Sequence, residues 1–287
     1  MPKERFHLYL ADELLNRCPD IAPLNEIHGP AGRPRGLSFF IGALSPDIFF
    51  YDLPSFSLSP LGDALHDLMD REGISPIEEW IAQTCPPSGA ARKRRVLWAL
   101  GFACHFMADA AWHPVINTLS RSMDYCGRKR LCEIECHRLL ESELEAHWLA
   151  RSPSPQRYND LLKDFERDRD RLFEMASSYS RFLEFVGLGT GVPEKRILRC
   201  YLSQNFLLRL FANRILGRKR DRLLDLPLAS YLGSLITPAR PVLPAQFSRA
   251  FPEDRNPFSD FFMEQALTSL NLQLRGLAQR LSQSPAG

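Results

Sequence analysis

The chain has 287 residues, a formal net charge of +2 and a hydrophobic fraction of 45%. This length allows one large domain or two smaller ones with a substantial core, and the near-neutral charge makes a nucleic-acid partner unlikely without excluding one. The seven cysteines form no CxxC pair and no regular framework, which indicates reduced thiols rather than a secreted disulfide scaffold.

The N-terminal stretch MPKERFHLYLADELL has neither the continuous apolar core nor the small-residue cleavage site of a signal peptide. We therefore expect a cytoplasmic protein. Residues 96–113 approach the length of a membrane-spanning helix, but they include an aspartate and two histidines, which are costly inside a bilayer. We interpret this stretch as a buried core helix and expect no transmembrane segment.

Apolar residues recur at helical spacing through most of the chain, and no segment alternates as a strand does. Pro46 and Pro54 interrupt residues 39–55, which predicts a short helix followed by an irregular turn that carries Asp47. The sequence thus predicts an all-α fold. In chain order the predicted helices span residues 4–18, 58–72, 90–113, 129–150, 153–186, 194–216, 222–235 and 257–283, with loops at 19–37, 124–128 and 237–257.

The candidate functional residues all lie in the first half of the chain. We therefore expect residues 1–152 to form a metal-binding helical domain, and residues 153–287 to form a helical extension that packs on it. The second part carries no recognisable motif.

The stretch GFACHFMADAAWHP, residues 101–114, contains the central motif. His105, Asp109 and His113 are four residues apart and so share one face of the predicted helix. A carboxylate in such apolar surroundings needs compensation, and a divalent metal would account for all three side chains. Because Pro114 disfavours helical backbone at the preceding residue, we expect His113 to lie at a helix end or kink and to serve a different metal.

A second stripe follows in HRLLESELE, where His137, Glu141 and Glu145 again share one helix face. Alone, this pattern is typical of a solvent-exposed charged face; beside the first stripe, it favours a metal site. The other histidines, His28 and His147, have no better claim than ordinary packing or exposure.

The order of these residues resembles the zinc-dependent phospholipase C family. His7 comes first, followed by GALSPD with Asp47, then His66, then the H-x3-D-x3-HP and H-x3-E motifs. The stretches FFIGALSPDIFFYD and GFACHFMADAAWHP carry most of the likeness, which covers roughly residues 5–150.

The resemblance implies a mostly helical bundle with two or three zinc ions between its helices. One ion would be held by Asp47, His66, His105 and Asp109, and Asp109 would bridge to a second ion shared with His7. A third would be held by His113, His137 and Glu141, with Glu145 as an outer acidic residue. Iron or manganese also suits such mixed sites.

One position departs from the family pattern. Secreted members use the amino group of a mature N-terminal tryptophan beside the first histidine, whereas His7 here follows Met-Pro-Lys-Glu-Arg-Phe. We expect the ion at His7 to be weak, absent or completed by a different ligand.

The resemblance also implies an activity: hydrolysis of a phospholipid or related phosphodiester by a metal-activated water, with peripheral contact to a membrane. Asp47 would be mainly a ligand and additionally a general base. Two alternatives stay open at this stage, a single-strand-specific zinc nuclease and a non-catalytic protein that keeps a structural metal site.

Overall fold

The computed structural model describes residues 4–18, 36–86, 88–121, 131–152, 156–189, 191–226, 229–241 and 251–283, and in these ranges it contains helices and no strand. The prediction of an all-α fold is confirmed. The helices are α1 (Glu4–Arg17), α2 (Leu37–Leu44), the 3-10 helix η2 (Ser45–Tyr51), α3 (Ser59–Glu72), α4 (Ser75–Thr84), α5 (Gly89–Arg121), α6 (Glu133–Arg151), α7 (Gln156–Arg167), α8 (Arg169–Phe185), α9 (Glu194–Phe211), α10 (Arg214–Leu224), α11 (Ser230–Leu235), the 3-10 helix η4 (Glu253–Arg255) and α13 (Asp260–Gln283).

Helix α5 is the central element, and α2 crosses it at very close range. Two glycines permit this crossing. A Cβ atom on Gly42 would lie 2.1 Å from the carbonyl oxygen of Trp98, and one on Gly101 would lie 1.9 Å from that of Phe39. The crossing fixes η2, which directly follows α2, against the middle of α5.

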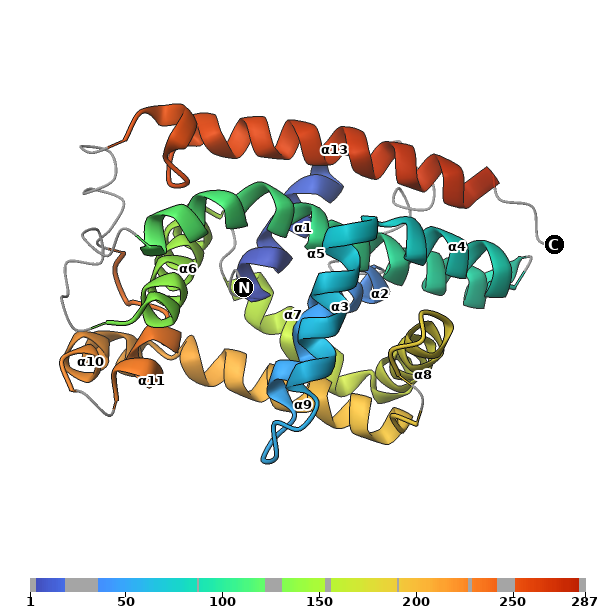
Figure 1. Ribbon diagram of the computed structural model, residues 1–287, viewed down its shortest axis with the longest axis horizontal. Coiled ribbons are helices and arrows are strands. Elements are labelled where there is room, and N and C mark those ends of the chain that lie inside the picture. Colours follow the sequence, from blue (N-terminus) through green and yellow to red (C-terminus); the bar gives the residue numbers. More distant parts are fainter. Residues whose placement is uncertain are drawn as a thin grey trace.

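The other helices surround this pair (Figure 1). Helix α13 runs along one side of the molecule and packs on α5, α1 and α4, while α9 runs along the opposite side and packs on η2, α8 and α7. Helices α1 and α6 both pack against α5 and against each other. No described helix is long and apolar enough to cross a bilayer, and residues 96–109 of α5 are buried in the core, as we expected.

One hydrophobic core extends from α1 to α13 and includes residues on both sides of position 152. The division into residues 1–152 and 153–287 stays a prediction. None of the six cysteines within the described ranges forms a disulfide with another of them.

The structure corrects the predicted surroundings of Asp47. The chain does not leave α2 through an irregular turn; Ser45 keeps helical dihedral angles of −59° and −42°, and the helix tightens into η2 with Pro46 in its first turn. Proline is tolerated in the first turn of η2, so Pro46 lies where the hydrogen-bonding pattern changes from α to 3-10 and the helical path continues.

The sequence predicted that the helix either ends or kinks at His113, and the structure shows that it does not end there. Helix α5 continues through Pro114 to Arg121. The turns on both sides of the proline bury apolar side chains, including Trp112, Ile116 and Leu119, and this packing outweighs the loss of one backbone hydrogen bond.

Several predicted boundaries differ as well. The helix α4 was not predicted, although it buries Trp80 completely. The predicted helix at 153–186 is two helices, α7 and α8, separated at Asp168, whose side chain caps α8. The segment 194–235 contains three helices rather than two, because Asn213 caps a new helix. The predicted loop at 124–128, most of that at 19–37, and His28 lie outside the described residues.

Candidate metal centre

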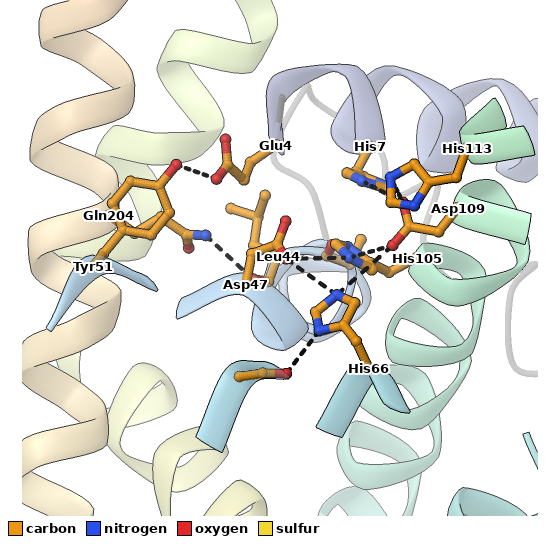
Figure 2. A network of polar contacts seen from close by, with 12 residues as sticks. Glu4, His7, Leu44, Asp47, Tyr51, His66, His105, Asp109, His113 and Gln204 are labelled. Atoms are coloured by element: carbon orange, nitrogen blue, oxygen red, sulfur yellow. Dashed lines mark hydrogen bonds and ion pairs between the residues drawn. The ribbon is translucent and has the colours of Figure 1, made fainter. Parts of the chain in front are cut away.

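Eight side chains from five elements converge at α5. Figure 2 shows His7, Asp47, His66, His105, Asp109 and His113 among them. The eight side chains are the predicted ligands, and the structure brings them together in three groups that could each hold a metal ion, of which the first two share His105. The groups are His7, His105 and Asp109; Asp47, His66 and His105; and His113, His137 and Glu141.

Asp109 lies at the middle of the cluster. Its Oδ1 is 3.4 Å from Nε2 of His7 and 3.5 Å from Nε2 of His113. Its Oδ2 is 3.3 Å from Nε2 of His105 and 3.8 Å from Nε2 of His66. One carboxylate thus faces histidines from three helices, which suits a bridging position. His113 thus lies close to Asp109 on the same helix.

Asp47 projects from η2 towards the same point (Figure 2). Its Oδ1 lies 3.4 Å from Nε2 of His66 and 3.6 Å from Nε2 of His105. The carboxyl group is completely buried. Because α2 is locked on α5 through Gly42 and Gly101, η2 holds Asp47 at a fixed distance from the α5 ligands.

The third group lies between α5 and α6. Nε2 of His137 is 2.7 Å from Oε1 of Glu141, one helical turn away, and Nε2 of His113 is 3.9 Å from the same oxygen. His113 therefore groups with the α6 pair, as the sequence predicted, while it remains close to Asp109. Glu145, which we expected near this group, instead accepts a hydrogen bond from Thr237 and lies 3.8 Å from the Arg5 guanidinium.

Two of the histidines are oriented by main-chain carbonyls. Nδ1 of His66 donates to the carbonyl of Gly62, and Nδ1 of His105 donates to that of Ala43, both at 2.9 Å. A carbonyl oxygen only accepts, so these bonds place a proton on Nδ1 and leave Nε2 as the nitrogen that faces the carboxylates. This is the tautomer that binds a metal through Nε2.

The buried polar atoms at this point lack hydrogen-bond partners in the described part of the chain. They include both carboxylate oxygens of Asp47 and of Asp109, and Nε2 of His7, His66, His105 and His113. Such orphaned buried atoms are rare in folded proteins, and these are acceptors aimed at one another. A set of imidazole nitrogens and carboxylate oxygens is a donor set that zinc accepts. The residues present therefore fit the metal.

The charges of the two central carboxylates, Asp47 and Asp109, also suit metal ligation. Burial raises the pKa of Asp109, but the charges of His105 and His113 outweigh burial and hold that pKa well below its usual range. The pKa of Asp47 is lowered in the same way, because His105 and His66 offset its burial. Burial lowers the pKa of His105, yet Asp109 and Asp47 raise it to about 9, so a metal ion that binds its Nε2 would displace a proton. Both carboxylates are thus ionised at neutral pH, as metal ligands must be.

Glu4 is a further buried carboxyl group near the cluster, and the sequence analysis did not predict it. It lies one turn before His7 on α1 and accepts a hydrogen bond from the Tyr51 hydroxyl. Burial, together with the charge of Asp47, raises the pKa of Glu4 to about 8. The available signal was its position three residues before His7, which places both side chains on one helix face.

A cavity of about 520 Å³ opens beside the third group, with His137 and Glu141 in its wall. The rest of the wall is mainly apolar and comes from the end of η2 and the following turn, α6, α9 and α11. Its apolar and aromatic members are Phe50, Tyr51, Leu53, Phe56, Ile134, Leu207, Leu208, Phe211, Tyr231, Leu232 and Leu235. Phe50 and Tyr51 come from the end of η2, whereas the preceding Phe49 is a core residue.

Fold and site together define an all-helical protein in which three candidate histidine–carboxylate metal groups lie together, the third of them beside an apolar cavity. Comparison with known protein families gives a match to zinc-dependent phospholipase C over residues 6–186, from α1 to the end of α8. This match covers more than half of the chain, so the protein belongs to the zinc-dependent phospholipase C family. No curated protein and no solved structure gives a match.

Proposed function

We propose that this protein is a zinc-dependent phosphodiesterase that hydrolyses a phospholipid to diacylglycerol and a phosphorylated head group. Asp47, His66, His105 and Asp109 would hold one ion, and Asp109 and His7 a second. His113, His137 and Glu141 would hold the third. The family supports a metal-dependent hydrolase, and the convergence of unpartnered ligand atoms supports the assignment of residues.

The observation that carries the proposal is the position of the third group at the cavity wall. It supplies three protein ligands, and a catalytic site, unlike a structural one, keeps an open coordination position. His137 and Glu141 face the cavity, so that position is accessible to a phosphoryl group. This favours an enzyme over a protein in which the metal is only structural.

The chain's own residues orient and charge the site. Zinc, when bound, polarises phosphoryl oxygens and lowers the pKa of a bound water towards about 7. The carbonyls of Gly62 and Ala43 hold His66 and His105 in the ligating tautomer. Asp47 stays ionised beside them, so its carboxylate can accept a proton from the attacking water as well as bind metal.

The cavity wall favours a lipid over a nucleic acid. A single-stranded nucleic acid needs a basic groove for its backbone, whereas the described lining contains one arginine and no lysine. Apolar side chains at the mouth are exposed, including Phe56, Ile134, Tyr231 and Leu232. We propose that the wall accommodates acyl chains and that these exposed residues contact the membrane surface.

The test is release of diacylglycerol from phosphatidylcholine and phosphatidylserine vesicles by the zinc-loaded chain, with single-stranded DNA as the competing substrate. A His137→Ala variant removes one ligand of the open group, and Glu133→Gln changes an exposed residue at the same cavity. We expect lipid hydrolysis that His137→Ala abolishes and Glu133→Gln retains. Cleavage of DNA without lipid hydrolysis would favour the nuclease, and bound zinc without hydrolysis of either would favour a structural role.

A further inference from the structure

Arg138 lies next to the candidate ligand His137 on α6 and contributes to the same cavity wall. Its guanidinium carbon is 4.3 Å from the centre of the Tyr231 ring, which α11 places across the cavity mouth. This distance is within the range of a cation–π interaction. The Arg138 side chain is therefore held in a defined position, and the residue before it in the chain is the candidate ligand His137.

Arg138 is the single arginine or lysine among the described residues of the cavity wall. The acidic residues of that wall that are not candidate ligands already have partners. The carboxyl group of Glu4 accepts a hydrogen bond from the Tyr51 hydroxyl. The carboxylate of Glu145 lies beside the Arg5 guanidinium, and that of Glu133 forms an ion pair with Arg121. None of these carboxylates forms an ion pair with Arg138.

Glu135, three residues before Arg138 on α6, interacts with the charge of this arginine, but its hydrogen bonds are made elsewhere. Its two oxygens accept from the Ser230 hydroxyl and from the backbone N–H of Cys132. Nη1 of Arg138 is buried, and the described part of the chain offers it no acceptor. Leaving a cationic donor buried without an acceptor is costly, whereas a planar guanidinium is well suited to bind a carboxylate or phosphate.

We propose that Arg138 is a specificity-determining residue that binds an anionic group on the substrate's head group, a carboxylate or a phosphate additional to the phosphodiester being cleaved. This inference rests on the proposed function, because it assigns the substrate of the same site. Tyr231 is a positioning residue that keeps the guanidinium in the cavity. It belongs to α11, outside the residues that match the family.

Phosphatidylserine and phosphatidylethanolamine form the decisive substrate pair, because they differ only by one carboxylate. Short-chain monomeric forms avoid effects of surface charge. We expect kcat/KM for phosphatidylserine to exceed that for phosphatidylethanolamine by about tenfold, as one charge-assisted hydrogen bond allows. Phosphatidylinositol and its 4-phosphate form the corresponding pair for a phosphate and show which anion is preferred.

The variant Arg138→Met keeps an unbranched side chain against Tyr231 but removes the charge. It should abolish the preference by lowering kcat/KM for phosphatidylserine while that for phosphatidylethanolamine stays within twofold. Arg138→Lys should retain part of the preference, and Tyr231→Leu should weaken it. Arg218→Met, an exposed arginine on α10 that does not line the cavity, is the matched control and should change nothing.

Binding of the two products provides a measurement that does not require turnover. Calorimetric titration of the zinc-loaded chain with O-phosphoserine and phosphoethanolamine should show tighter binding of O-phosphoserine, and Arg138→Met should remove the difference. If this holds although no lipid is hydrolysed, the proposed function fails and the anion site stands. If Arg138→Met weakened binding or hydrolysis equally for both members of a pair, Arg138 would bind the phosphate that they share. If all variants behaved alike, Arg138 would have only a structural role. Either result overturns the proposal.

Discussion

The imidazole rings of His7 and His105 stack face to face, with centroids 3.8 Å apart and planes inclined by 15°. They come from α1 and α5, and both are almost completely buried. Two protonated rings would repel each other at this distance. Burial and the neighbouring His105 lower the pKa of His7 accordingly, so at neutral pH the Nε2 atom of His7 is free to bind a metal next to Asp109.

Metal content should therefore depend on His105, whose Nε2 faces both Asp47 and Asp109. We expect the purified chain, without an affinity tag that binds metal, to carry two or three zinc ions per molecule by mass spectrometry. His105→Ala should lose at least one of them. His147→Ala is the matched control, since this histidine packs on Trp148 and Phe258, away from the cluster. A chain that stays metal-free in excess zinc would contradict the assignment.

The carboxylate of Glu141 should control one ion separately. Glu141→Gln keeps the size of the side chain and removes the charge that faces His137 and His113. We expect one zinc ion fewer per chain, because a neutral amide is a weaker ligand than a carboxylate. Glu133→Gln, at the same cavity but outside the cluster, should keep the full zinc content. Retention of all zinc in Glu141→Gln would remove Glu141 from the ligand set.

The crossing of α2 and α5 makes Gly101 a position that tolerates no side chain. The Cβ atom of Gly101→Ala would meet the Phe39 carbonyl at 1.9 Å, and backbone cannot move aside cheaply. Overpacking of this kind costs about 3 kcal/mol, which lowers the Tm by roughly 6–12 °C for a chain of this size. Thermal unfolding measures it, with loss of zinc expected as the helices separate.

The control for that variant is Gly276→Ala on α13. There the nearest atom to a new Cβ is the flexible end of Arg280, at 3.3 Å. Alanine inside a helix is favoured over glycine by about 0.5–1 kcal/mol, so Gly276→Ala should leave the Tm unchanged or raise it slightly. Equal Tm values for both variants would contradict the tight crossing.

Helical periodicity pointed to five of the eight predicted ligands, because residues four apart share one face, whereas His7, Asp47 and His66 were predicted only from the resemblance to the family. His105 with Asp109, and His137 with Glu141, needed only that rule. Pattern reasoning could not show that α5 passes through Pro114, since tertiary packing decides whether a helix tolerates a proline. It also missed Arg138 and Tyr231, because their contact joins α6 to α11 and no local spacing reports it.

Asp52 provides a test of stability against pH away from the metal cluster. This buried carboxylate lies 2.6 Å from Nη2 of Arg196 and 3.2 Å from Nη2 of Arg199. Its hydrogen bond from Arg196 is the main reason that its pKa lies far below the usual range. Asp52→Asn should lower the free energy of unfolding on the order of 2 kcal/mol at pH 7, since both arginines are partly exposed and screened.

The pH dependence of that loss follows from the lowered pKa. The stabilisation by Asp52 is fully present above the pKa of the unfolded chain, about 4, and is lost as the pH falls towards the folded pKa. The difference between wild type and Asp52→Asn should therefore be constant from pH 7 to 5 and shrink below about 4. Asp260→Asn, an exposed partner of Arg151, should change stability by less than about 0.5 kcal/mol. A difference that grows on acidification would refute this account.

Contact with a membrane should depend on the exposed apolar residues at the cavity mouth. The turn between η2 and α3 projects beyond α9, on the side of the molecule opposite α13 (Figure 1). Phe56 in this turn is 52% exposed, and Leu232 on α11 is 53% exposed. Inserting both side chains into a lipid interface would contribute roughly 1.5–3 kcal/mol each if they were fully buried. Co-sedimentation with phosphatidylcholine and phosphatidylserine vesicles measures the effect.

The double variant Phe56→Ser/Leu232→Ser should bind these vesicles at least tenfold more weakly than the wild type. Leu272→Ser removes a side chain that is 68% exposed but lies on α13, at the opposite side of the molecule. It should bind as the wild type does. Since no serine replaces a candidate ligand, zinc content should be retained in both variants. If the double variant and Leu272→Ser bound vesicles equally weakly, vesicle binding would reflect general surface hydrophobicity. If the double variant bound vesicles as the wild type does, the membrane contact would lie elsewhere.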